Sequence, residues 1–238
     1  MPYVLSPLIN CGSQSMWSEG PGYERKTLHK IEEGKLPPVN YDEHILRPHS
    51  LTHFETPAHT METGSRLESY FQNHINYFYG RTFVIKLSGN NFKKLKDNIY
   101  HWEITASEIQ SRLKNFNSER FEKILISVDD YPENSDGYHD PNYVLTLSQE
   151  AADFLVSLEG FHLYGTSWKS SDFNPGRRER PIHNTLFSKA LVLENLRLNG
   201  VPEGVYFMSA FPLPLNEASE SPVVPVLFTK EEIFSFSE

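Results

Sequence analysis

The chain has 238 residues, of which 38% are hydrophobic and 13% aromatic, which is enough for one large domain with a sizeable core. Its formal net charge of -9, without a long basic run, argues against nucleic acid or an anionic membrane surface as the main partner. A small anionic substrate stays compatible with this charge, because local charge can oppose the net charge. No apolar run approaches the length of a membrane span, so we expect no membrane partner.

Cysteine usage and the N-terminal residues bear on the compartment. Cys11 is the only cysteine, so no internal disulfide can form and a reducing compartment, the cytoplasm, is expected. Residues 1–10 include two prolines and lack a basic segment, so we expect no secretory signal there. Nothing in the sequence around Cys11 indicates an activated nucleophile.

The first half of the chain is predicted to hold short strands joined by polar segments. We expect strands over 3–9, 41–46 and 82–87, a loop over 11–23, a solvated segment over 26–36, and a loop or edge over 89–98. Apolar residues at helical spacing predict a helix over 65–78. Thr105 and Glu108 form a capping box that predicts the start of a further helix, continuing through Leu113.

In the second half, strands again outnumber helices. The aliphatic run 123–128 predicts a buried strand, and Ser148 and Gly160 mark the two ends of a helix. We also expect a loop over 129–142, strands over 161–164, 191–193, 204–208 and 223–228, and a short helix or turn over 181–189. Because no repeat or linker interrupts the chain, one domain over 1–238 is predicted.

The stretch 49–59, His-Ser-Leu-Thr-His-Phe-Glu-Thr-Pro-Ala-His, gathers three imidazoles and one carboxylate. Pro48 and Pro57 disfavour a helix here, and in an extended segment side chains two and four positions apart point the same way. His49, His53 and Glu55 would then project to one side. Two nitrogens and one oxygen meeting at a point are typical ligands of a catalytic zinc ion with a position left for water. A solvated histidine cluster is the alternative interpretation.

One short segment rarely completes a buried metal site, so further ligands are expected downstream. His183 and Glu194 stand out downstream, although neither would be singled out without the family resemblance described below. Glu194 directly follows the aliphatic run 191–193, which places it at a strand end, where catalytic groups are common. The alternative for Glu194 is an ordinary surface carboxylate, and His183 has a similar alternative.

The stretch 49–59 resembles the signature His-x-Gly-Thr-His-x-Asp-x-Pro-x-His of the metal-dependent "putative cyclase" family. That family includes the bacterial-type kynurenine formamidases and the isatin hydrolases. Thr52, Pro57 and the three histidines match, whereas Leu51 and Glu55 stand in place of the family's glycine and aspartate, and Ser167 stands where the family often has aspartate. The resemblance covers most of the chain, through the segments 3–8, 147–148, 165–172, 183, 191–196, 202–206, 210–213 and 221–223.

The resemblance implies a metal site and a fold. His49, His53 and Glu55 would bind a first metal ion, and Glu55 would bridge to a second ion held by His183 and Glu194. The ions, one or two, would be divalent, with zinc the first expectation and manganese the second. The implied fold is a compact α/β domain with a mixed β core and flanking helices, of the swivelling β/β/α type, assembled as a homodimer or tetramer.

The implied activity is hydrolysis of a small amide, ester or lactam, as in an arylformamidase. The metal would lower the pKa of a bound water, and His59, as catalytic base or acid, would carry the proton to the leaving group. The sequence contains no Gly-x-Ser-x-Gly elbow and no glycine-rich phosphate loop. Trp17, Trp168 and Phe54 are candidates for an aromatic substrate wall, with core packing as the alternative for each.

Two other functions stay open. The departures at Leu51, Glu55 and Ser167 leave room for an altered family member that binds a metal or a ligand without turnover. The second alternative is a structural or interaction domain whose histidines only form hydrogen bonds. Metal content measured beside a hydrolase screen separates the three hypotheses.

Overall fold

The computed structural model describes residues 1–13 and 15–234. Within these residues, nine strands form one mixed sheet in the order β1-β14-β12-β5-β8-β10-β11-β4-β13. The four central strands run parallel: β5 (Tyr79–Leu87), β8 (Lys123–Val128), β10 (Leu163–Thr166) and β11 (Leu191–Glu194). Antiparallel strands flank them: β12 (Gly204–Ser209), β14 (Val226–Phe228), β1 (Tyr3–Val4), β4 (His53–Glu55) and β13 (Glu220–Pro222).

The central strands are buried on both faces because helices cover each side. Every residue of β8 is buried, as expected for a parallel strand inside an α/β sheet. On one face Ile124 and Ile126 pack under α2 (Ala106–Leu113), α3 (Gln149–Ser157) and α4 (Pro181–Phe187). On the other face Leu125 packs in a second core with residues of α1 (Leu67–Asn73). The alternation along β8 therefore separates two apolar cores.

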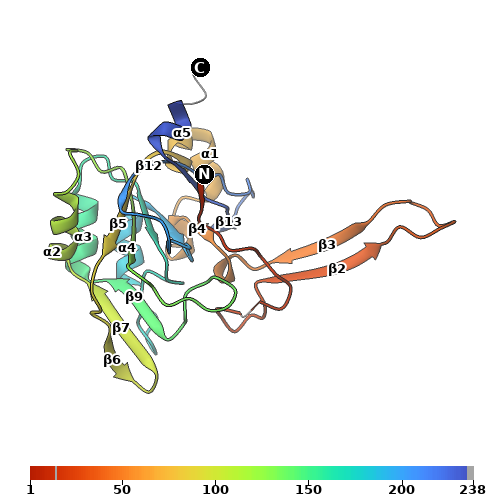
Figure 1. Cartoon of the computed structure of the whole chain (residues 1–238), viewed down its shortest axis with the longest axis horizontal. Coiled ribbons are helices and arrows are strands. Elements are labelled where there is room, and N and C mark those ends of the chain that lie inside the picture. The colour runs from red at the N-terminus through yellow and green to blue at the C-terminus, as the bar shows by residue number, and fades with distance from the viewer. Residues whose placement is uncertain (14, 235–238) are drawn as a thin grey trace.

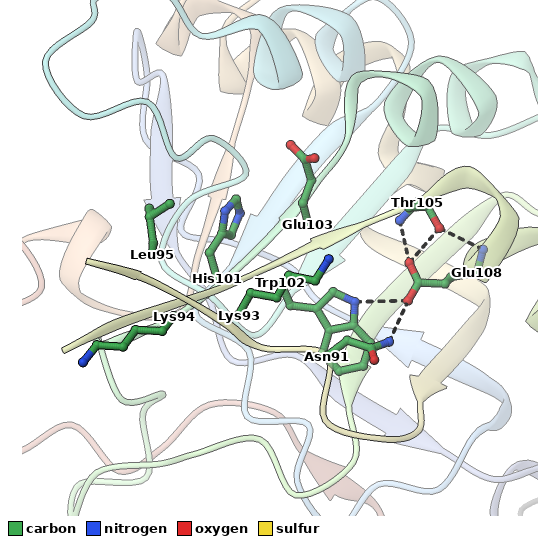
Figure 2. Close-up of a pocket in the computed structure, with 9 residues that line it drawn as sticks. All are labelled: Asn91, Lys93, Lys94, Leu95, His101, Trp102, Glu103, Thr105 and Glu108. Carbon is green, nitrogen blue, oxygen red and sulfur yellow. Dashed lines mark hydrogen bonds between the residues drawn. The ribbon is translucent and has the colours of Figure 1, made fainter. Parts of the chain in front are cut away.

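The capping box predicted for α2 is present. The Thr105 backbone N–H donates to Glu108 Oε2 at 2.8 Å, and the Glu108 N–H donates to Thr105 Oγ1 at 3.3 Å. Figure 2 shows that Glu108 also accepts from Trp102 Nε1 and Asn91 Nδ2. These residues line a cavity of about 590 Å³ beside a small sheet of β6 (Lys93–Lys96), β7 (Ile99–Ile104) and β9 (Tyr143–Leu147). The half-buried carboxylate of Glu108 is used by the helix cap, so this cavity has a structural explanation.

A two-stranded hairpin projects from the body of the molecule (Figure 1, orange). It pairs β2 (Tyr23–His29) with β3 (Tyr41–Leu46). The strand over 41–46 is confirmed. Residues 26–36 are exposed, as expected of a solvated segment, but residues 26–29 belong to β2, which the sequence did not predict. The side chains of β2 are exposed or half-buried, so no hydrophobic alternation marks it, and backbone pairing with β3 defines the strand.

Other predicted elements differ in their bounds. The first strand covers Tyr3–Val4 only, and the strand expected from residue 161 begins at Leu163. The helix expected over 65–78 divides into α1 and a 3-10 turn over Ile75–Phe78, because His74 leaves helical geometry with φ -140° and ψ 41°. The last described helix is α5 (Lys230–Phe234), and none of the helices in the described residues is long and apolar enough to cross a membrane.

Candidate metal centre

The predicted site residues meet at the carboxyl ends of the parallel strands, where α/β sheets commonly bind ligands. Glu194 is the last residue of β11. β4 pairs antiparallel with β11, so His53 lies opposite Glu194 and Glu55 lies opposite Val192. This pairing joins the histidine-rich stretch to the downstream segment that supplies Glu194.

The stretch 49–59 is not a continuous helix, in agreement with its prolines. It consists of a 3-10 turn over Pro48–Ser50, the strand β4, and a second 3-10 turn over Pro57–His59. Proline opens each turn, where its missing N–H costs nothing. His53 and Glu55, two positions apart on β4, share a face of the strand, and His49 and His59 come from the flanking turns.

Glu55 lies at the centre of the cluster, with a different set of histidines at each carboxylate oxygen. Its Oε1 is 3.1 Å from His49 Nδ1, 3.1 Å from His53 Nε2 and 3.4 Å from His59 Nε2. Its Oε2 is 3.0 Å from His183 Nε2. The glutamate is 2% exposed, so this carboxylate is removed from bulk water and depends on these partners.

Glu194 closes the cluster from the opposite side. Its Oε1 is 3.3 Å from His183 Nε2 and accepts a hydrogen bond from Ser171 Oγ at 2.8 Å, and its Oε2 is 4.0 Å from His53 Nε2. All six predicted site residues are thereby brought together. Two sets of three side chains have ligand atoms within 4.8 Å of one another: His49, Glu55 and His59, and His53, Glu55 and Glu194. Both sets share Glu55, and the first includes His59, which the resemblance assigned to proton transfer.

Two histidines are oriented by partners outside the cluster. His53 Nδ1 lies 2.9 Å from the carbonyl oxygen of Leu51, and because a carbonyl only accepts, Nδ1 carries the proton. His183 Nδ1 lies 2.6 Å from Asp172 Oδ2, and Asp172 also accepts from the backbone N–H groups of Ile182 and His183. In the neutral rings, Nε2 of each histidine therefore presents its lone pair to the cluster, as in metal-binding histidines.

The pKa values show how strongly these groups depend on one another. Burial raises the pKa of Glu55, but hydrogen bonds from His183, His49 and His53 hold it well below its usual value. Burial lowers the pKa of His183, but hydrogen bonds to Asp172, Glu194 and Glu55 bring it well above its usual value. A divalent cation would take over the charge compensation that protons on the imidazoles provide, and this buried set of imidazoles and carboxylates fits such an ion.

Asn195 holds the histidine-bearing turn against β11 and was not singled out from the sequence. Its φ of 58° lies in the left-handed region, which asparagine tolerates better than most residues. Its Nδ2 donates to the carbonyl oxygens of His49 at 3.1 Å and Leu51 at 2.9 Å. Leu51 itself has φ -121°, which any residue adopts, so glycine is not required at this position.

The cluster opens into a cavity of about 250 Å³, whose lining includes His49, Glu55, His59, His183 and Glu194. Trp17 also lines it, and its Nε1 donates to the carbonyl oxygen of His49 at 3.1 Å. Of the three aromatic side chains considered for a substrate wall, Trp17 is therefore the one that lines the cavity beside the cluster. Phe54 is fully buried against Phe78 in the core, and Trp168 lines a neighbouring cavity instead.

The chain is similar to several known proteins. The family model described as "Putative cyclase" matches residues 9–172. A kynurenine formamidase from Bacillus cytotoxicus is 27% identical over 190 residues, which cover 79% of this chain and 80% of the relative. The kynurenine formamidase of Bacillus anthracis is 26% identical over 225 residues, which cover 94% of this chain and 95% of the relative.

Solved structures share the fold. Isatin hydrolase A from Labrenzia aggregata superposes with a TM-score of 0.72 at 16% identity, covering 97% of this chain and 94% of that one. A protein described as a predicted metal-dependent hydrolase from Bacillus stearothermophilus gives 0.69 at 22% identity, covering 95% and 97%. These likenesses confirm the mixed α/β fold that the sequence predicted.

Proposed function

The chain belongs to the cyclase family, and from this premise we propose that it is a metal-dependent hydrolase of a small amide, ester or lactam. The observation that carries this proposal is the buried cluster around Glu55, open on one side to a cavity large enough for a small molecule. Relatives named kynurenine formamidase and isatin hydrolase support cleavage of a carbon–nitrogen bond in a small substrate.

Five side chains would hold the metal: His49, His53, Glu55, His183 and Glu194. One or two divalent ions fit this donor set, with zinc as the first candidate and manganese as the second. When bound, such an ion lowers the pKa of water and polarises a carbonyl oxygen. Asp172 holds the His183 ring in place, and Ser171 does the same for the Glu194 carboxylate.

His59 would move the proton. Burial lowers its pKa, so the ring is neutral near pH 7 and able to accept a proton on its unprotonated nitrogen. The side chain is 26% exposed and lines the cavity, so a substrate can approach it. His59 would take a proton from the attacking water and return it to the leaving amine or alcohol.

Metal removal tests the proposal. We expect dialysis against a chelator to abolish hydrolysis of small amides, esters or lactams, and added zinc or manganese to restore it. Elemental analysis of protein purified without added metal should find a divalent ion. Full activity after exhaustive metal removal would contradict the proposal, and bound metal without turnover on a broad substrate screen would favour a binding protein.

A His59→Ala variant tests the division of roles. We expect it to retain the metal and lose turnover, whereas exposed His29→Ala on the hairpin serves as the matched control. Elemental analysis and initial rates are the two measurements. Loss of metal together with activity would instead make His59 a ligand, as its grouping with His49 and Glu55 allows.

We also propose that the protein acts in the cytoplasm as a homodimer or tetramer. The projecting hairpin exposes Leu28, Tyr41 and Ile45, apolar side chains that a second copy would cover. Light scattering coupled to size exclusion measures the assembly directly, and a monomer at all concentrations would contradict this proposal. Cys11 is exposed and unpaired, which suits a reducing compartment.

A further inference from the structure

A second cavity adjoins the one beside the metal cluster. It has a volume of about 380 Å³ and shares Trp17, Lys169, Ser170 and Arg180 with the smaller cavity. The two cavities therefore meet at a boundary that carries two cationic side chains. A molecule with its reacting bond at the cluster would pass Lys169 and Arg180 before its remainder reached the second cavity.

The wall of the second cavity is largely apolar. Ile99, Val144, Phe173 and Trp168 line it, and Trp168 lies edge-on to Phe173 with ring centroids 5.7 Å apart. Ile99 and Phe173 are partly exposed and offer a surface for an aryl or branched alkyl group, whereas Val144 and Trp168 are almost fully buried. The apolar wall beside two cations indicates a ligand that is both apolar and negatively charged.

Arg180 is available to a ligand. Across residues 1–13 and 15–234, its guanidinium makes no hydrogen bond or ion pair with another side chain or with the backbone. Its backbone is held firmly, because it directly precedes α4 and its carbonyl accepts from Asn184 N–H at 2.9 Å. The same helix carries His183, so Arg180 has a fixed place relative to the cluster.

Lys169 is likewise held at the boundary. Its Nζ donates to the carbonyl oxygen of Met16 at 2.6 Å and lies 4.2 Å from the centre of the Trp17 ring. An ammonium has three donors, so two stay open to a ligand. Glu19, which also lines the smaller cavity, is exposed and offsets part of the charge, leaving a boundary that is positive overall.

We propose that this boundary is a carboxylate-binding subsite, so that the preferred substrate carries a carboxylate close to its scissile amide and an apolar group beyond it. Arg180 would bind the carboxylate through two parallel N–H donors, Lys169 would add a third contact, and the apolar group would lie against Ile99 and Phe173. N-acylated amino acids with apolar side chains and ortho-acylamino benzoates have this layout. The inference rests on the proposed function, because it places the scissile bond at the metal cluster.

Paired probes test the subsite. The acids N-formyl-L-phenylalanine and 2-formamidobenzoate are compared with their primary carboxamides on the metal-containing enzyme. We expect at least one acid to be preferred by about tenfold or more in kcat/KM, a ratio within reach of one charge-assisted contact. Arg180→Gln and Lys169→Gln should each reduce this preference, mainly through KM, whereas Arg178→Gln on the same segment, which lines neither cavity, should behave as the wild type.

A binding measurement separates this inference from the proposed function. Calorimetric titration should show 3-phenylpropanoate binding about tenfold tighter than 3-phenylpropanamide to the wild type and to Arg178→Gln, and this difference should vanish in Arg180→Gln. Equal binding of acid and amide, or a preference that survives both Arg180→Gln and Lys169→Gln, would overturn the subsite. If none of the formyl probes is hydrolysed, the broad substrate screen decides the proposed function, and the titration alone decides the subsite.

Discussion

Two clusters of buried ionisable side chains lie at opposite ends of the same parallel strands, and their partners differ. At the carboxyl ends, Glu55 and His183 are of opposite charge and 3.0 Å apart. At the amino ends, Lys123 Nζ lies 2.8 Å from His162 Nε2, and within the described residues no carboxylate pairs with that lysine. One end of the sheet thus compensates its charges, and the other does not.

The pKa values follow this difference. At the cluster around Glu55, hydrogen bonds overcome burial and raise the pKa of His183 well above its usual value. At the opposite end burial prevails, lowering the pKa of Lys123 to about 8 and that of His162 below its usual value. Burial lowers the pKa of His183, Lys123 and His162 alike. The hydrogen-bond partners, and not the depth of burial, therefore decide which side chain keeps its charge. Of the two clusters, only the one at the carboxyl ends contains carboxylates, those of Glu55 and Glu194, that could bind a cation.

The largest effect is expected from removing the central charge. Glu55→Gln keeps the shape of the side chain but removes its charge. The four imidazoles that now contact two carboxylate oxygens would meet a single acceptor oxygen. We expect metal content to fall sharply and activity to fall by more than about 100-fold, beyond the loss usual for residues outside the ligand set. Elemental analysis and initial rates measure both, with exposed Glu62→Gln as the control. Near-normal metal content in Glu55→Gln would contradict the proposed central role of this carboxylate in metal binding.

A smaller effect is expected from the carboxylate behind His183. Asp172 accepts three hydrogen bonds, two from backbone N–H groups and one from His183 Nδ1, and an amide in Asp172→Asn can accept only on its oxygen. We expect metal affinity to fall about 10- to 100-fold. Competition with a fluorescent chelator gives the affinity, and exposed Asp153→Asn on α3 is the control. Unchanged affinity would show that packing alone orients the His183 ring.

The sequence predicted those parts of this arrangement that local signals encode. The strand 123–128 has the predicted bounds, because a run rich in β-branched and aliphatic residues indicates a buried strand. The prolines flanking β4 excluded a helix, and the period of two placed His53 and Glu55 on one face. Recognition of distant ligands required the resemblance, since nothing near His183 or Glu194 indicates a partner far away in the chain.

What the sequence did not predict depends on contacts between distant segments. Asp172 was noted only as the end of the segment 165–172, because its role arises when α4 folds back over it. Asn195 acquires its role from the pairing of β4 with β11. Strand β2 lacks an apolar alternation and is defined by its pairing with β3. Strand β7 does alternate, with Trp102 and Ile104 buried on either side of exposed Glu103, so this strand carried a local signal that the sequence-based prediction did not use.

The smallest effect comes from the uncompensated end and concerns stability. The pKa of Lys123 is about 8 in the folded protein against 10.5 for the free side chain, so between these values the unfolded chain binds a proton that the folded protein does not. Unfolding free energy should therefore rise with pH, by about 2 kcal/mol between pH 7.5 and 9.5. Denaturant titrations measure the slope, which Lys123→Met should lose and exposed Lys114→Met should keep. Parallel profiles for the wild type and Lys123→Met would show that this lysine is compensated in the folded state, and the contrast between the two ends of the sheet would then disappear.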